Sequence, residues 1–161
     1  MILTFNISLP KNRLLPGTLM AVSNEGEVLL DPPRACLGLA DSAAAVQHGN
    51  KDRDPLRPFG DTPLGRYRVT VIPAAQNTHS YGICRRLLLT PFQGPCVEAE
   101  SNGRRGLEIH EGDENPNYVS WKFLRPTDGC VRVQRETMQA SLARIDKHQP
   151  AEIWTNITEA A

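Results

Sequence analysis

The chain has no net charge and no long hydrophobic run. Its 18 Lys and Arg residues balance 18 Asp and Glu residues over 161 positions. It therefore has no overall field that would hold nucleic-acid phosphates or an anionic membrane surface. The longest apolar runs, such as Leu37–Ala40 and Leu87–Leu89, are far shorter than the roughly 18 residues of a membrane-spanning helix. These absences argue against a nucleic-acid partner and against a transmembrane segment.

Paired cysteine motifs and a signal segment are also missing. The cysteines stand at positions 36, 84, 96 and 130, without the C-x-x-C pair typical of zinc or thioredoxin-like redox sites. We therefore expect no metal and no cofactor. The first residues, MILTFNISLPKNR, lack a basic n-region and predict a strand, not a signal peptide. Cys84 and Cys96 are candidates for a disulfide across a hairpin. The cysteines do not indicate whether the protein works in an oxidising or a reducing compartment.

The composition favours a mainly β protein. Twelve Gly and 13 Pro favour many turns over long helices, and 40% hydrophobic residues suffice for one core, so residues 1–161 are expected to form a single domain. Alternating or apolar stretches bounded by turn residues predict strands. Beyond the N-terminal strand, these are a hairpin over Gly17–Leu30 and strands at Tyr67–Ile72, Arg85–Thr90, Leu107–His110 and Glu152–Ile157.

One helix is expected. Between Gln134 and Lys147, the apolar residues Met138, Leu142 and Ile145 recur at helical spacing, and a proline at position 150 ends the pattern. The segment from position 41 to position 61 is polar and broken by proline. It predicts a surface loop without a helix.

A cysteine after a turn is the best candidate for chemistry. Cys130 follows Thr127-Asp128-Gly129, and a nucleophilic thiol needs a base or a positive neighbour because few free thiols are ionised at neutral pH. His110 ends an apolar segment, and a strand fixes an imidazole better than a loop does. It is therefore favoured over His48, His79 and His148.

Three motifs in order resemble the YkuD-type L,D-transpeptidase catalytic domain. They are Thr62-Pro63-Leu64-Gly65-Arg66-Tyr67, Ile109-His110 and Thr127-Asp128-Gly129-Cys130-Val131-Arg132. The resemblance extends from about position 17 to position 157 and implies a mainly β, sandwich-like fold with one or two short helices. It also implies an enzyme that cleaves the bond after the third residue of a peptidoglycan stem peptide. The acyl group is held as a thioester and passes to an amine of another stem, giving a 3→3 cross-link.

The resemblance also implies roles for individual residues. Cys130 matches the nucleophile and His110 the base, with a backbone carbonyl of Glu111 or Gly112 as the third member of the triad. The amides of Gly129 and Cys130 would form the oxyanion hole.

Five further residues are expected to organise the site or contact substrate: Thr127, Asp128, Arg132, Tyr118 and Trp121. Asp128 stands where many family members have histidine. Its carboxylate would disfavour a thiolate at Cys130, so we expect Arg125 or Arg132 to pair with it. Tyr118 and Trp121 would shape the groove or pack beside it.

Several functions of the same site stay open. Water as acceptor gives an L,D-carboxypeptidase, and a free D-amino acid gives an exchange enzyme, including a secreted antibacterial effector. A rival of another class is an inactive peptide-binding β-domain. By resemblance, the periplasm or cell envelope is the expected location, although no signal peptide is visible in the chain, and the sequence does not indicate the oligomeric state.

Overall fold

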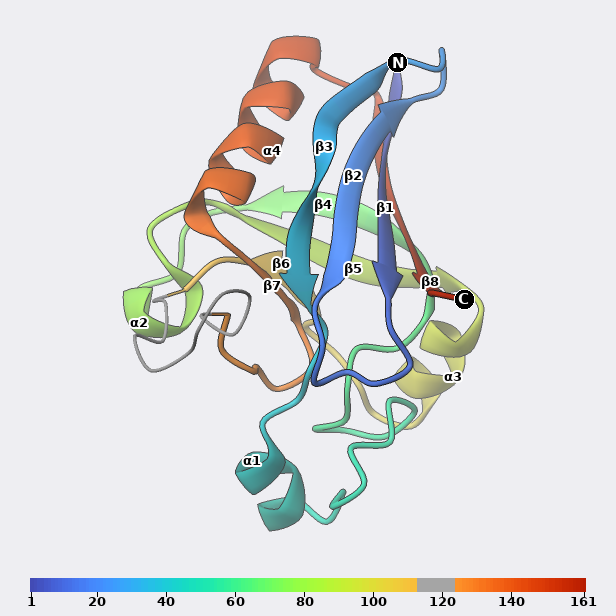
Figure 1. Cartoon of the computed structure of the whole chain (residues 1–161), viewed down its shortest axis with the longest axis vertical. Coiled ribbons are helices and arrows are strands. Elements are labelled where there is room, and N and C mark those ends of the chain that lie inside the picture. The colour runs from blue at the N-terminus through green and yellow to red at the C-terminus, as the bar shows by residue number, and fades with distance from the viewer. Residues whose placement is uncertain (113–123) are drawn as a thin grey trace.

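The strands close into one barrel (Figure 1). The computed structural model describes residues 1–112 and 124–161. Around the barrel the strand order is β1-β2-β3-β7-β6-β5-β4-β8. The strands are β1 (Ile2–Leu9), β2 (Gly17–Ser23), β3 (Val28–Leu37), β4 (Gly65–Ile72), β5 (Arg86–Gln93), β6 (Glu108–His110), β7 (Val131–Val133) and β8 (Glu152–Glu159).

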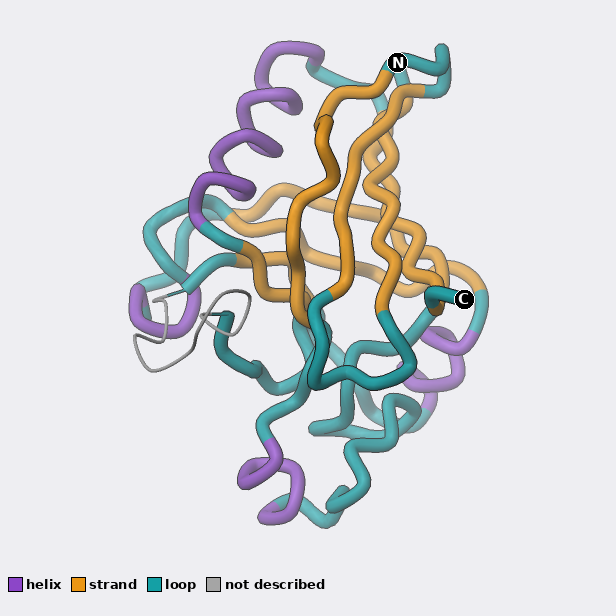
Figure 2. Tube along the Cα trace, in the orientation of Figure 1, coloured by secondary structure: helices purple, strands orange, loops and turns teal. Residues whose placement is uncertain are grey.

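The mainly β class is confirmed, but the strand pairing describes a barrel in place of the sandwich that the resemblance implies. The last strand makes the difference, because β8 pairs in parallel with β1 along its whole length and antiparallel with β4. Strand β8 thereby joins β1 to the antiparallel pair formed by β4 and β5. In Figure 2 the long strands β1 to β3 cross β4 and β5 steeply, as expected of strands that tilt around a barrel.

The N-terminal strands form for the reasons that the sequence suggests. Along β1 every second side chain is buried, which places Leu3 and Phe5 in the core. The predicted hairpin joins β2 to β3, and its turn is held by the Ser23 hydroxyl, which accepts from the amides of Glu25 and Glu27. At the turn Gly26 has φ +84°, a conformation that favours glycine.

The predicted helix is present as α4 (Arg135–His148). Met138, Leu142 and Ile145 are buried in the main core, and the helix lies beside β3 in Figure 1. It ends at Gln149, whose φ of 43° is left-handed.

Within the described residues, three short helices occur besides α4, so the expectation of one or two short helices is wrong. They are α1 (Ser42–Gln47), α2 (Thr78–Tyr81) and α3 (Pro95–Ser101). Each helix begins at a residue that favours a helix N-terminus, although the composition as a whole favours turns. Asp41 caps α1 by accepting from the Ala44 amide at 2.8 Å, Asn77 caps α2, and Pro95 stands in the first turn of α3. The segment from position 41 to 61 is therefore not wholly a loop.

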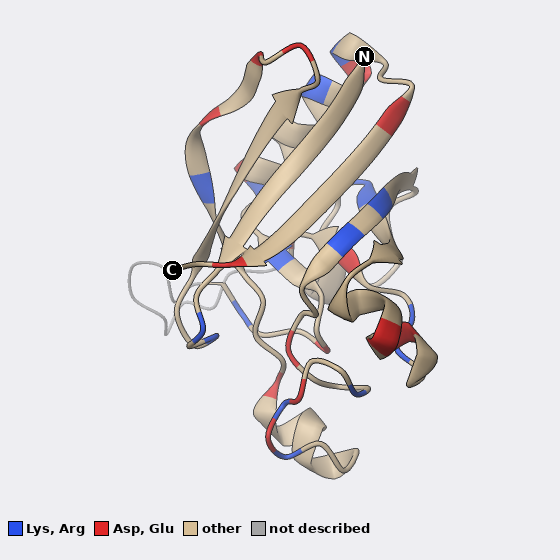
Figure 3. Cartoon of the chain, turned by 90° about the vertical axis from the view of Figure 1, so that its right-hand side faces the viewer, with Lys and Arg blue, Asp and Glu red and all other residues tan. Residues whose placement is uncertain are grey.

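The four cysteines are free thiols, so the suggested link between Cys84 and Cys96 is not formed. Cys96 is buried and its sulfur contacts the carbonyl of Gln93 at 3.3 Å. Both signs of charge are spread over the chain in Figure 3, which matches the balanced composition. Among the described residues, no helix has the length and apolar composition needed to cross a membrane.

Candidate active site

Parallel pairing of β6 with β7 brings the predicted base and nucleophile together. Ile109 lies opposite Val131, and His110 lies opposite Arg132. Cys130 directly precedes Val131 and so lies next to the strand pair. His110 and Cys130 line the same hollow of about 190 Å³. His110 and Cys130, 20 positions apart in the sequence, are thus brought together beside these two short neighbouring strands.

His110 is held as a neutral imidazole. Its side chain is 2% exposed, and its Nδ1 lies 2.5 Å from the carbonyl oxygen of Glu111. Because a carbonyl only accepts, Nδ1 carries the proton and Nε2 keeps its lone pair. Burial lowers the pKa of His110 to about 4, and the positive charges of Arg132 and Arg86 act in the same direction.

Of the two carbonyls that the resemblance offers as the third member of a triad, that of Glu111 contacts His110 Nδ1. Arg132 Nη1 donates to the same oxygen at 3.3 Å, so two side chains converge on it. Gly112, which we expected among the catalytic residues, instead makes room for Arg132. A Cβ at position 112 would lie 1.5 Å from Arg132 Nη1.

The Glu111 side chain fixes this segment from the other side. Its carboxylate is wholly buried and accepts from the Cys84 amide at 2.8 Å and from Arg135 Nε at 2.7 Å. The backbone that orients His110 is therefore tied both to the segment after α2 and to the first residue of α4.

The turn before Cys130 is held by two threonines. Thr62, from the first motif, donates its hydroxyl to the Gly129 carbonyl at 2.7 Å. Thr127 donates to the Cys130 carbonyl and accepts from the Gly129 amide, each at 2.9 Å. The Gly129 amide is thus engaged inside the turn, and its expected role in an oxyanion hole stays a prediction. Of the predicted pair, the amide of Cys130 remains the candidate donor.

A buried arginine that sequence reasoning missed stands behind this turn. Gly129 has φ +114°, and a Cβ there would lie 1.9 Å from Arg104 Nη2, so the position needs glycine. Arg104 is 4% exposed and donates to four backbone carbonyls, those of Pro55, Gly60, Asp61 and Asp128. Nothing in the sequence near position 104 marks this role, because all four acceptors lie in other segments.

The thiol of Cys130 is neutral in this environment. The residue is partly exposed, and its sulfur lies 3.8 Å from the Gly106 carbonyl. Burial of the thiol raises the pKa of Cys130 to about 12, and the carboxylates of Glu108 and Asp128 add to the rise. The Glu108 amide and the charge of Arg104 oppose it.

The residues expected to bind substrate take different positions. Thr127 and Asp128 line the hollow with Cys130, but Thr127 is buried and works within the turn. The Asp128 side chain is exposed and makes no ion pair within residues 1–112 and 124–161. The expected pairing is therefore wrong for those residues, since Arg125 contacts His79 and Arg132 contacts Glu111. Tyr118 and Trp121 lie outside the described residues.

Tyr81 was not among the expected site residues. Its ring lies 4.7 Å from that of His110, and it lines the shared hollow and a second one of about 330 Å³. Phe59 and Arg105 line the second hollow, and Cys130 borders both. In the sequence, the one signal that pointed toward Tyr81 was the nearby His79, a titratable residue on the same short helix.

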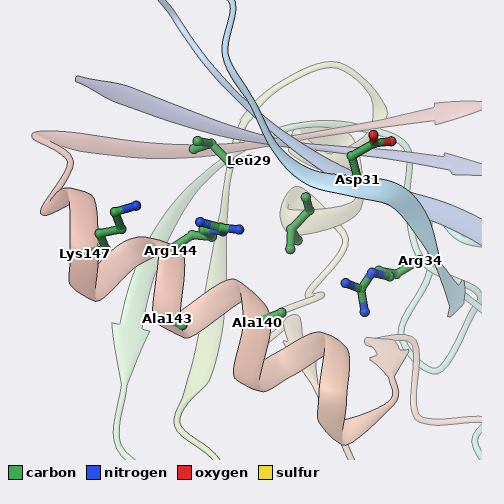
Figure 4. A pocket seen from close by; sticks show the side chains of 8 residues that line it. Leu29, Asp31, Arg34, Ala140, Ala143, Arg144 and Lys147 are labelled. Atoms are coloured by element: carbon green, nitrogen blue, oxygen red, sulfur yellow. The ribbon is translucent and has the colours of Figure 1, made fainter.

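A third hollow lies away from these motifs, between β3 and α4 (Figure 4). Its volume is about 240 Å³, and Arg34 from β3 and Arg144 and Lys147 from α4 line it together with Asp31. None of the residues predicted for the site lines it.

Comparisons with known proteins support the fold alone. No protein-family model and no curated protein matches the chain. Among solved structures, the chain is similar to the helical cell shape determining protein Pgp2 from Campylobacter jejuni, with a TM-score of 0.56 and 14% identity over 99% of this chain and 49% of that one. It is also similar to Bd1075 from Bdellovibrio bacteriovorus, with a TM-score of 0.54 and 15% identity over 96% of this chain and 47% of that one. The chain thus spans about half the length of either protein.

Proposed function

We propose that the chain is a cysteine-dependent L,D-transpeptidase that acts on peptidoglycan stem peptides in the cell envelope. The observation that carries the proposal is the placement of Cys130 and His110 in one hollow, with His110 Nδ1 bound to the Glu111 carbonyl. This is the arrangement of a thiol nucleophile, a base and a group that orients the base. The similarity to a cell-shape determinant is in keeping with a substrate in the cell wall.

The proposed reaction starts from two neutral groups. As Cys130 Sγ attacks the carbonyl of the third stem residue, its proton moves to His110 Nε2, and the charge on the carbonyl oxygen is met by the Cys130 amide. The imidazolium then gives the proton to the leaving nitrogen of the terminal D-residue, and a thioester remains. An amine of a second stem attacks the thioester, its proton returns through His110, and the thiol is regenerated.

Two features favour an amine as the acceptor. Cys130 borders two hollows, so a second peptide can approach the thioester from a different side than the first. The exposed Asp128 carboxylate lines both hollows and would attract an ammonium group. The carboxypeptidase and exchange reactions use the same residues with water or a free D-amino acid as acceptor.

Mass spectrometry of the purified protein with a disaccharide-tetrapeptide tests this function. We expect release of the terminal D-residue and formation of 3→3 dimers by the wild type. Cys36→Ala, which removes a thiol buried in the core, should retain both activities, whereas Cys130→Ala should lose them. Tripeptide without dimers would favour the carboxypeptidase, and products containing an added D-amino acid would favour exchange. No cleavage by a folded wild type would favour the inactive binding domain.

A further inference from the structure

The Arg104 guanidinium is a buried positive charge, and no carboxylate within residues 1–112 and 124–161 binds it. Its four hydrogen-bond acceptors are neutral backbone carbonyls, at 2.7 to 3.3 Å. Three of them belong to the segment from position 55 to 61, and the fourth is the carbonyl of Asp128 in the turn before Cys130. A charge that is 4% exposed is poorly screened by water and salt, so its field extends into its surroundings.

That field reaches the sulfur of Cys130. The guanidinium occupies the space that a Cβ at position 129 would need, and it donates to the carbonyl of Asp128. It therefore lies against the two residues before Cys130. Other charged or titratable groups act on this thiol or line the hollows beside it. They are Glu108 on β6, Asp128 in the turn, His110, Tyr81 on α2, Asp41, Arg105, Arg125 and Arg132. The carboxylates of Glu108 and Asp128 disfavour a thiolate, and the Arg104 cation opposes them. Glu108 is itself paired with Arg86 through both carboxylate oxygens, which weakens its effect.

We infer that Arg104 is a positioning residue that holds the Cys130 turn in place and favours negative charge on the Cys130 sulfur. The importance of this role for catalysis rests on the proposed function, but the effect on the thiol does not. A purely structural arginine would change the stability of the turn and leave the intrinsic reactivity of the thiol unchanged. The two roles therefore differ in a measurable property.

The test is the alkylation rate of Cys130 by iodoacetamide between pH 8 and pH 10, followed by peptide mass spectrometry in a Cys84→Ala background. Below the pKa of the thiol, the rate is proportional to the thiolate fraction. Removing one nearby opposite charge shifts a pKa by roughly one unit or more. We therefore expect Arg104→Met to alkylate about tenfold more slowly at each pH, and Arg104→Lys, which keeps the charge, to stay within about threefold of the wild type.

Arg13 offers a matched control. It is also buried, at 7% exposure, and it also donates to a backbone carbonyl, that of Thr62 at 2.8 Å. Arg13→Met should lower the thermal midpoint but leave the alkylation rate within about twofold. If Arg104→Met does not fold, Arg104→Gln, which keeps two donors and loses the charge, carries the same expectation.

The inference is overturned if the folded neutral variant alkylates at the wild-type rate. It is also overturned if Arg13→Met slows the reaction as much, or if the lysine variant restores nothing. Because alkylation needs no substrate, a tenfold effect would stand even if the protein failed to cleave stem peptides. Conversely, cleavage with an unchanged alkylation rate would refute only the role of Arg104.

Discussion

The buried neutral state of His110 predicts how folding stability depends on pH. Folding lowers the pKa of this imidazole from an ordinary value of 6.5 to about 4. Between these values the unfolded chain binds a proton that the folded chain does not. Protonation therefore favours unfolding, and the contribution of His110 is fully present above pH 6.5 and is lost as the pH falls toward 4.

The size of the effect follows from the two pKa values. One pH unit of difference corresponds to about 1.4 kcal/mol. The full shift therefore amounts to about 3 kcal/mol, of which about 2 kcal/mol is already lost at pH 5. Burial also raises the pKa of the carboxyl groups of Asp61 and Glu108, so protonation of these groups adds to the pH dependence. Only a comparison between variants isolates the imidazole.

Urea unfolding at pH 7.5 and pH 5 provides the measurement. The loss of unfolding free energy on acidification should be about 2 kcal/mol smaller in His110→Gln than in the wild type. Val133→Ala, which truncates a buried side chain on β7, is the control because it lowers stability and keeps the imidazole. Its loss on acidification should equal that of the wild type. Equal losses in wild type and His110→Gln would refute the assignment of a buried neutral imidazole.

Three further predictions concern the proposed chemistry. Cys130→Ala should abolish release of the terminal D-residue, and a carbapenem should add one equivalent of mass, measured on the intact protein, only when Cys130 is present; an adduct on the alanine variant would indicate another thiol. His110→Ala should lower kcat/KM by about 10²- to 10⁴-fold, the usual scale for a positioned acid–base group, and His79→Ala should have a far smaller effect; equal losses would refute the choice of base. Asp128→Asn should lower the ratio of transfer to hydrolysis, because the carboxylate that attracts the acceptor amine is lost. It should also speed thiol alkylation, because Asp128 raises the pKa of Cys130. If neither the ratio nor the alkylation rate changes, Asp128 is only a solvated turn residue.

The parts of the fold that could be predicted from sequence depend on local patterns. Alternation predicted β1, turn residues predicted the hairpin of β2 and β3, and helical spacing predicted α4. The closed barrel could not be predicted in this way. It depends on the pairing of β8 with β1 and β4, and these contacts join residues that lie far apart in the sequence. The short helices were missed because a single cap such as Asp41 decides them.

The same distinction between local and long-range contacts applies within the site. The motifs located Cys130 and His110, and the structure places both in one hollow. They could not reveal that the Gly129 amide is engaged by Thr127, since that depends on the path of the turn. Nor could they reveal Arg104, whose contacts reach four residues in other segments.

The charges around Cys130 bear on when its proton moves. With a thiol pKa of about 12 and an imidazole pKa of about 4, a thiolate and imidazolium formed before substrate binding would be strongly disfavoured. Sulfur attack and proton transfer to His110 would therefore have to occur together, or after substrate has changed the surroundings of the thiol. In the proposed reaction, the Arg104 charge favours the sulfur as it becomes negative, and the Glu111 carbonyl stabilises the imidazole as it becomes positive. Both groups then favour the charges that develop during the attack.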